Sequence, residues 1–158
     1  MASILKNKKV SFFLFSVLLL FLIALLFFIF SKPQEGGNFA YIGNNKLEVE
    51  IADNPIETYR GLSFKENLPE GSGMLFIFSD YDKRKFVMRN MNFPIDIIFI
   101  KDGIVREIKA DCPPEGSEPK VIYESNDYVN MVLEVPAGYA KRNNIEPGTT
   151  FNFSKNLK

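Results

Sequence analysis

Residues 46–52 read KLEVEIA, so that Leu47, Val49 and Ile51 occupy every second position and charged residues fill the positions between them. Successive side chains of a β-strand point to opposite faces of the sheet. This alternation therefore predicts a strand with one buried and one solvated face.

Similar segments recur along the rest of the chain, with turn residues at intervals of roughly ten positions. Further strands are predicted at residues 73–78, 85–91, 95–100, 104–109, 128–135 and 149–153. Two short helices interrupt them: one begins at Pro55, with Asp53 or Asn54 as its N-cap, and the other follows Gly138. Residues 39–158 are thus expected to form a mainly β domain, a small antiparallel β-sandwich or barrel with two short helices.

The N-terminal part of the chain has a different character. Residues 10–30 contain no charge in 21 positions, and a helix of that length spans about 31 Å, close to the hydrocarbon thickness of a bilayer. We therefore predict that a transmembrane signal-anchor helix at 10–30 precedes the β domain and crosses the lipid bilayer, followed by a polar linker at 31–38. Cleavage as a secretory signal is the alternative, but bulky Phe28 and Phe30 stand where a cleavage site needs small residues.

The lysines around this segment predict its orientation. Lys6, Lys8 and Lys9 precede it, whereas Lys32 alone follows it closely. The positive-inside rule then places a basic tail at 1–9 in the cytoplasm and the β domain at 39–158 outside the cell membrane.

Composition excludes several classes of function. The 158 residues include 19 basic and 19 acidic side chains, no histidine and a single cysteine, Cys112. A balanced charge argues against a nucleic-acid partner. Without histidine or a second cysteine, the chain cannot form an internal disulfide, a zinc site of three or four Cys/His ligands, or a Ser-His-Asp or Cys-His catalytic site. We expect no metal site and no cofactor.

The junction between the predicted strands 85–91 and 95–100 suggests a candidate site. A three-residue hairpin connection would set Asn90 opposite Asp96, and Met88 opposite Ile98, on one face. Lys109 would lie on the other side of Asp96, although a bulged register is an open alternative. An amide and a carboxylate at the rim of an apolar face form a candidate ligand site. Alternatively, Asp96 accepts hydrogen bonds from backbone N–H groups and Asn90 supports it.

Six segments of this domain, in order, resemble the family of domain of unknown function 192. They include Arg60-Gly61-Leu62, Gly73-Met74-Leu75-Phe76, Pro94-Ile95-Asp96 and Glu134-Val135-Pro136, and the resemblance covers about residues 46–153. Val87 and Met91 depart from it, since the family typically has Trp and Thr there. The resemblance implies a compact, mainly β domain, often behind a signal or anchor, and brings no established activity.

Two charged residues complete the candidate site. Arg60 is expected either to clamp an anionic ligand or to pair with a carboxylate, and Glu134 is expected to face solvent because Leu133 and Val135 alternate with it. We interpret the domain as a non-catalytic module that binds a small molecule, a glycan or a protein through Arg60, Met88, Asn90, Asp96 and Glu134. The alternative is a hydrolase or glycan-processing accessory enzyme that uses Asp96, Glu134 and Arg60.

Overall fold

A computed structural model of the chain describes residues 15–23, 25 and 37–154. It divides the chain into two compact units, Met1–Glu35 and Gly36–Lys158. In the first unit, residues 15–23 and 25 are helical, and their large apolar side chains are exposed. The remainder of the predicted transmembrane segment, like the basic tail and residues 31–36 of the linker, lies outside the described residues. Within the described residues, no helix is long and apolar enough to span a membrane, so the anchor stays a prediction.

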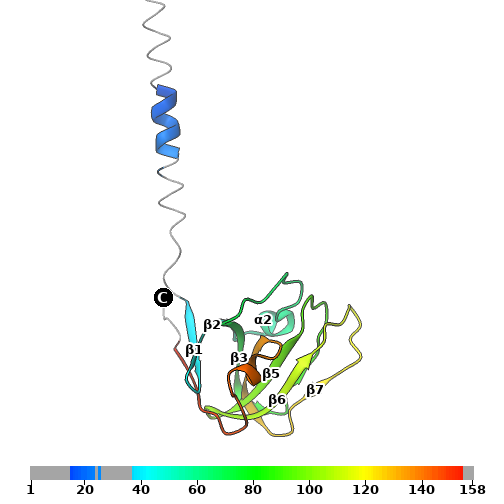
Figure 1. The fold of residues 1–158 in the computed structure, drawn as a ribbon. Coiled ribbons are helices and arrows are strands. Elements are labelled where there is room, and N and C mark those ends of the chain that lie inside the picture. Colours follow the sequence, from blue (N-terminus) through cyan, green and yellow to red (C-terminus); the bar gives the residue numbers. More distant parts are fainter. Residues whose placement is uncertain (1–14, 24, 26–36, 155–158) are drawn as a thin grey trace, which may run out of the picture. The chain divides into compact units, whose positions relative to one another are not determined.

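The second unit is built mainly from β-strands, as predicted (Figure 1). One curled sheet has the strand order β6-β5-β8-β3-β2-β1-β9 and forms a half-barrel, and β4 pairs separately with β7. All pairs are antiparallel except β2 and β3. The elements in chain order are β1 (Asn38–Ile42), β2 (Asn45–Ala52), α2 (Pro55–Arg60), β3 (Ser72–Asp82), β4 (Lys85–Phe86), β5 (Ile95–Lys101), β6 (Ile104–Cys112), β7 (Tyr123–Glu124), β8 (Val129–Pro136), α3 (Tyr139–Arg142) and β9 (Phe151–Ser154).

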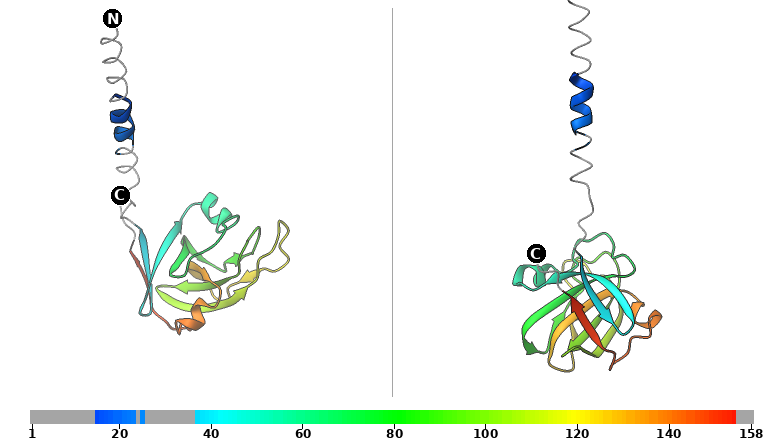
Figure 2. Two further views of the ribbon diagram at one scale, coloured as in Figure 1. Left: turned by 45° about the horizontal axis from the view of Figure 1, so that its top comes forward. Right: turned by 90° about the vertical axis from the view of Figure 1, so that its left-hand side faces the viewer.

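The two ends of the sheet approach each other, as the two views of Figure 2 show. An isolated bridge joins Ile104, at the start of β6, to Thr150, just before β9. Three backbone hydrogen bonds reinforce it, among them one of 2.7 Å from the Phe151 N–H to the Gly103 carbonyl. The sheet curls because β-sheets twist in one sense, and these bonds fix the curl at one end.

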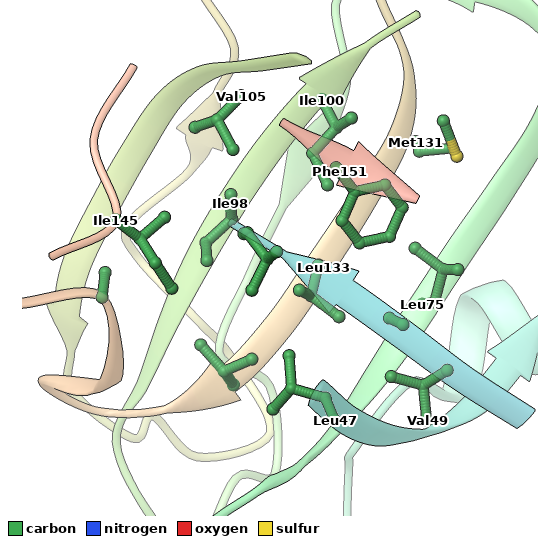
Figure 3. Packing of buried hydrophobic residues seen from close by; sticks show 14 of the residues in the cluster. Leu47, Val49, Leu75, Ile98, Ile100, Val105, Met131, Leu133, Ile145 and Phe151 are labelled. Atoms are coloured by element: carbon green, nitrogen blue, oxygen red, sulfur yellow. The ribbon is translucent and has the colours of Figure 1, made fainter. Parts of the chain in front are cut away.

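Residues from every strand of the curled sheet, and from α3, pack inside the curl to form what we call the inner core. Figure 3 shows most of these side chains. The inner core consists of Ala40, Ile42, Leu47, Val49, Leu75, Ile98, Ile100, Val105, Met131, Leu133, Val135, Tyr139, Ala140, Ile145 and Phe151.

A second cluster, the outer core, covers the opposite face of β3, β5 and β8. It is closed by Leu62 after α2 and by the segments around Met88 and Cys112. Its buried members are Ala52, Leu62, Met74, Phe76, Met88, Met91, Ile95, Ile97, Phe99, Cys112, Val129 and Val132. The central strands are therefore buried on both faces, so that alternation of polar and apolar residues does not separate core from solvent there.

The predicted hairpin between residues 85–91 and 95–100 is wrong. Only Lys85–Phe86 is a strand, and its partner is β7. The chain then turns: Asn90 has a left-handed φ of 53°, and its N–H donates to the Gly116 carbonyl at 3.0 Å. This hydrogen bond holds the segment against the loop that connects β6 to β8. Strand β5 therefore pairs with β6 and β8, and not with residues 85–91.

The second register is bulged, which was the open alternative. Asp96 lies opposite Val135 on β8, and Lys109 lies opposite Ile97, not beside Asp96. The pairing of β5 with β6 shifts between Ile95 and Ile97, so that β6 gains a residue at this point.

Candidate functional site

An open cleft of about 1060 Å³ lies beside α2, the helix labelled in Figure 1. Residues 53–55 and 58–63 line one side of it, and residues 76–80 of β3 together with the segment at 82–87 line the other. Asn54 fixes the start of α2, because its side-chain oxygen accepts from the N–H groups of Ile56 at 3.2 Å and Glu57 at 3.1 Å. Ligand sites in proteins commonly occupy about 300–1,000 Å³, so this cleft has room for an organic ligand.

Glu134 lies in the cleft lining and is only 5% exposed. It pairs with Met74 on β3 and Ile97 on β5, and therefore faces the outer core. Its Oε2 atom is buried and has no hydrogen-bond partner among the described residues. Burial raises the pKa of Glu134 to about 8, because the charged carboxylate is poorly solvated there. The predicted solvent exposure of Glu134 is wrong, because β8 is buried on both faces.

Arg84 also lines the cleft. Its guanidinium lies over the Phe78 ring at 3.9 Å, and its Nη2 donates to both the carbonyl and the carboxylate of Asp80 at 2.7 Å. This hydrogen bond lowers the pKa of Asp80. The Arg84 Nε is nevertheless buried without an acceptor. In the part of the chain that the structure describes, Arg84 Nε and Glu134 Oε2 are the two buried side-chain polar atoms left unpaired, and both belong to residues of this cleft.

Two more arginines lie at the side of the cleft that α2 forms. The Arg89 guanidinium lies 4.1 Å from the centre of the Tyr59 ring, and its Nη2 donates to the Tyr59 carbonyl at 3.0 Å. Arg60, at the end of α2, is exposed and makes no ion pair or side-chain hydrogen bond within the described residues. It is therefore free to contact a ligand.

Asp96 lies apart from the cleft and has a complete set of partners. It is fully buried, and its carboxylate accepts from the backbone N–H groups of Asp111 at 2.9 Å, Gly138 at 3.0 Å and Ala140 at 2.9 Å. These donors come from the bulge of β6 and from the start of α3. The interpretation of Asp96 as an acceptor for backbone groups agrees with these bonds, although the donors are not in the hairpin turn that we had expected.

The structure thus brings together two of the five predicted site residues. Arg60 and Glu134 line the same cleft, whereas Met88 is buried in the outer core, Asn90 forms a turn and Asp96 stabilises other loops. Sequence reasoning missed Arg84, because the charged run Asp82-Lys83-Arg84-Lys85 is typical of a solvated loop. The alternation of Phe76 and Phe78 just before this run was the available signal of an aromatic surface on which a cation can pack.

The described residues show neither a metal site nor a reactive thiol. They contain no group of three or more carboxylate or thiol side chains that could hold a metal ion. Cys112 is buried at the end of β6, and burial raises the pKa of its thiol to about 11. A protonated thiol is a poor nucleophile. We therefore interpret Cys112 as a packing residue of the outer core, to which it belongs.

Comparison with known proteins gives a family and a fold. The model of the DUF192 family (Uncharacterized ACR, COG1430) matches residues 39–153. A crystal structure from Sinorhizobium meliloti 1021, described as a "putative transcription regulator", is similar with a TM-score of 0.68 and 27% identity, over 77% of this chain and 98% of that one. A protein of unknown function from Novosphingobium aromaticivorans DSM 12444 has a TM-score of 0.68 and 28% identity, over 77% of this chain and 89% of its own. The comparison with curated proteins found no match.

Proposed function

Because the chain belongs to the DUF192 family, whose description names no activity, we propose a function from the cleft itself: the domain is a non-catalytic module that binds a ligand between Glu134 and Arg84. One observation carries this proposal. The two buried side-chain atoms without a partner in the described residues, Glu134 Oε2 and Arg84 Nε, belong to residues of a single open cleft.

The energetic argument is that unpaired buried polar groups destabilise a fold. Each costs about 1–3 kcal/mol, and more when the group is charged. Native proteins hold only a few such groups, and two in one cleft are explained if a ligand supplies the missing partners. The ligand would offer a donor or a cation to Glu134 and an acceptor to Arg84, with Arg60 as a further contact for an anionic group.

The enzyme alternative receives less support. It required Asp96, Glu134 and Arg60 in one concave site, but Asp96 does not line the cleft, and three backbone N–H groups occupy its oxygens. The pKa of Glu134, raised to about 8, would suit a general acid. A hydrolase of the two-carboxylate type needs a second positioned carboxylate, and Asp96 does not provide it.

We further propose that residues 10–30 anchor the protein in the cell membrane and that the domain at 39–158 lies outside the cytoplasm. The support is the uncharged run of 21 residues behind Lys6, Lys8 and Lys9. Secretion after signal cleavage is the alternative. A reporter enzyme fused after Lys158 that is active only in the cytoplasm would contradict the orientation, and a mature N-terminus near Ser31 would contradict the anchor.

We do not propose a nucleic-acid ligand. Three of the 19 basic residues precede the predicted anchor, which leaves 16 basic against all 19 acidic residues in the rest of the chain. Nucleic-acid-binding domains rely on a basic excess to attract phosphates. The description of the Sinorhizobium protein is therefore not transferred to this chain.

The test uses the full chain in nonionic detergent, with Glu134→Gln, Arg84→Gln and, as a matched control, Glu118→Gln on an exposed loop outside the cleft. Thermal unfolding is measured with a panel of free amino acids, short peptides and N-acetylated hexosamines. We expect at least one class to stabilise the wild type and the Glu118 variant, and to lose its effect in the two cleft variants. Equal stabilisation of all four proteins would contradict the cleft as the binding site.

A further inference from the structure

The strand β3 extends beyond the strand beside it. It runs to Asp82, whereas β2 pairs with it only as far as Ala52, opposite Phe76. Among the strands that the structure describes, none pairs with that edge of β3 beyond Phe76. A strand edge presents backbone N–H and C=O groups to its neighbour. Apart from the Asp80 carbonyl, which accepts from Arg84, residues 77–82 offer an edge to which another strand can be added.

The cleft occupies the place where β2 would have continued. β2 ends because the chain turns at Asp53 and Asn54, and Pro55 begins α2. One side of the cleft is lined by these residues and by Tyr59, and the other by residues 77–80 of β3. The open space therefore follows the free edge of β3, with α2 as its opposite wall.

The two unpaired buried groups belong to Glu134 and Arg84, which lie beside different residues of β3. Glu134 is opposite Met74, and the guanidinium of Arg84 lies over Phe78, four residues further on. At about 3.3 Å per residue, these positions are separated by ~13 Å. Four or five residues of extended peptide span this length of the strand and can therefore reach both groups.

The edge itself disfavours a second copy of the same chain. The exposed side chains of Asp80 and Asp82 lie on it. Charged side chains are one of the features by which proteins prevent edge-to-edge association. In a symmetric pair, each acidic edge would face another acidic edge, whereas a peptide of different sequence avoids that repulsion.

We propose that the cleft binds an extended peptide segment, which adds as a strand to the free edge of β3 and directs a basic side chain to Glu134. The proposal rests on the proposed function, because it assigns a ligand class to the same cleft. The peptide cation supplies the partner that Glu134 Oε2 lacks, and a peptide carbonyl or carboxylate accepts from Arg84 Nε. Main-chain pairing provides affinity, and the side chains that enter the cleft provide selectivity.

The first stage of the test selects a peptide. The full chain, immobilised in nonionic detergent, is screened against a random heptapeptide library displayed on phage, beside Glu134→Gln and the control Glu118→Gln. We expect the wild type and the control to enrich peptides with Lys or Arg at one fixed position, and Glu134→Gln to lose that preference. Failure to enrich any peptide above detergent-coated beads would overturn the proposal.

The second stage tests strand addition with the enriched peptide made synthetically. Two versions carry N-methyl groups on the two alternate sets of backbone amides, and binding is measured by fluorescence polarisation. Because only one set of amides faces the edge of a neighbouring strand, one version should bind at least about tenfold more weakly, while the other stays close to the unmethylated peptide. Equal binding of both versions would overturn strand addition.

The outcomes separate the two proposals. If free amino acids or N-acetylated hexosamines bind through Glu134 and Arg84 but no peptide binds, the peptide assignment is wrong and the proposed function stands. If neither peptides nor small compounds bind in the cleft, both are wrong. A detergent-corrected mass showing a dimer that Glu134→Gln dissociates, together with no enrichment of any peptide, would identify a second copy as the occupant and would overturn the peptide assignment.

Discussion

Replacement of Glu134 by Gln should make the domain more stable at pH 8 and remove most of the pH dependence between pH 5 and 8. Burial raises the pKa of Glu134 from 4.5 to about 8. In that interval the folded state keeps the proton and the unfolded state releases it, so the stability of the wild type falls as pH rises. The two pKa values differ by about 3.5 units, and 1.36 kcal/mol per unit gives a total loss of about 5 kcal/mol once the pH exceeds both values. That is a large fraction of the roughly 5–15 kcal/mol that stabilises a typical domain.

The chain is well suited to this measurement because it has no histidine, and burial raises the pKa of Cys112 to about 11. The usual titrating side chains of this pH range are therefore missing. Urea unfolding of the full chain in nonionic detergent, followed by circular dichroism from pH 5 to 8.5, gives the free energy of unfolding for the wild type, Glu134→Gln and the control Glu118→Gln. We expect the curves of the wild type and the control to fall together and that of Glu134→Gln to stay nearly flat. A slope in Glu134→Gln equal to that of the wild type would refute the assignment of the buried, unpaired carboxyl.

Three other predictions concern stability and reactivity. Asp96→Asn should lower the free energy of unfolding by about 1–3 kcal/mol, because a carboxylate that accepts from three backbone N–H groups is replaced by an amide; an unchanged midpoint in urea would argue against this role. Cys112 should react with a thiol reagent at pH 8 only after unfolding, and a fast reaction of the native protein would show that it is not buried. Residues 36–158, expressed alone, should give a β-rich circular dichroism spectrum and one cooperative melt that reducing agent does not shift; a disordered spectrum would show that this unit needs the N-terminal segment.

Much of the fold could be predicted from local pattern. The alternation at residues 46–52 corresponds to β2, and Asn54 and Pro55 begin a helix as their capping and backbone preferences indicate. The predicted strands at 73–78, 95–100, 104–109, 128–135 and 149–153 correspond to β3, β5, β6, β8 and β9, with ends that differ by a few residues. These features depend on neighbours in sequence, which a local pattern contains.

The hairpin failed because its pairing depends on contacts that are distant in sequence. Three connecting residues permit a hairpin, but the Asn90 N–H bonds to Gly116 and the Met88 carbonyl accepts from Glu115. These contacts hold the segment against a loop that begins more than twenty residues later. Since β5 already has β6 and β8 as neighbours, both of its edges are occupied and no position is left for a further strand.

The burial of Glu134 was not predicted, because one solvated face was assumed for each strand. The sequence Met131-Val132-Leu133-Glu134-Val135 was interpreted as alternating, which sends Glu134 to solvent. A run in which four of five residues are apolar is equally typical of a strand buried on both faces, and in that case the single acid is a buried acid. With that interpretation, Glu134 would have been the first candidate for a functional carboxylate.

The two buried carboxyl groups among the described residues show why an unpaired polar atom, rather than burial alone, indicates a functional residue. Asp96 and Glu134 lie on the adjacent strands β5 and β8 and face opposite cores, because Asp96 is opposite Val135 and Glu134 is opposite Ile97. Asp96 is fully buried, but three backbone N–H groups occupy its oxygens, so its removal would cost stability. Glu134 has a similar burial and an oxygen without any partner among the described residues, so the fold gains nothing from its charge and loses stability when it ionises. A neutral side chain of the same shape would stabilise the domain at that position, and a carboxyl group there is explained by the ligand that pairs with it.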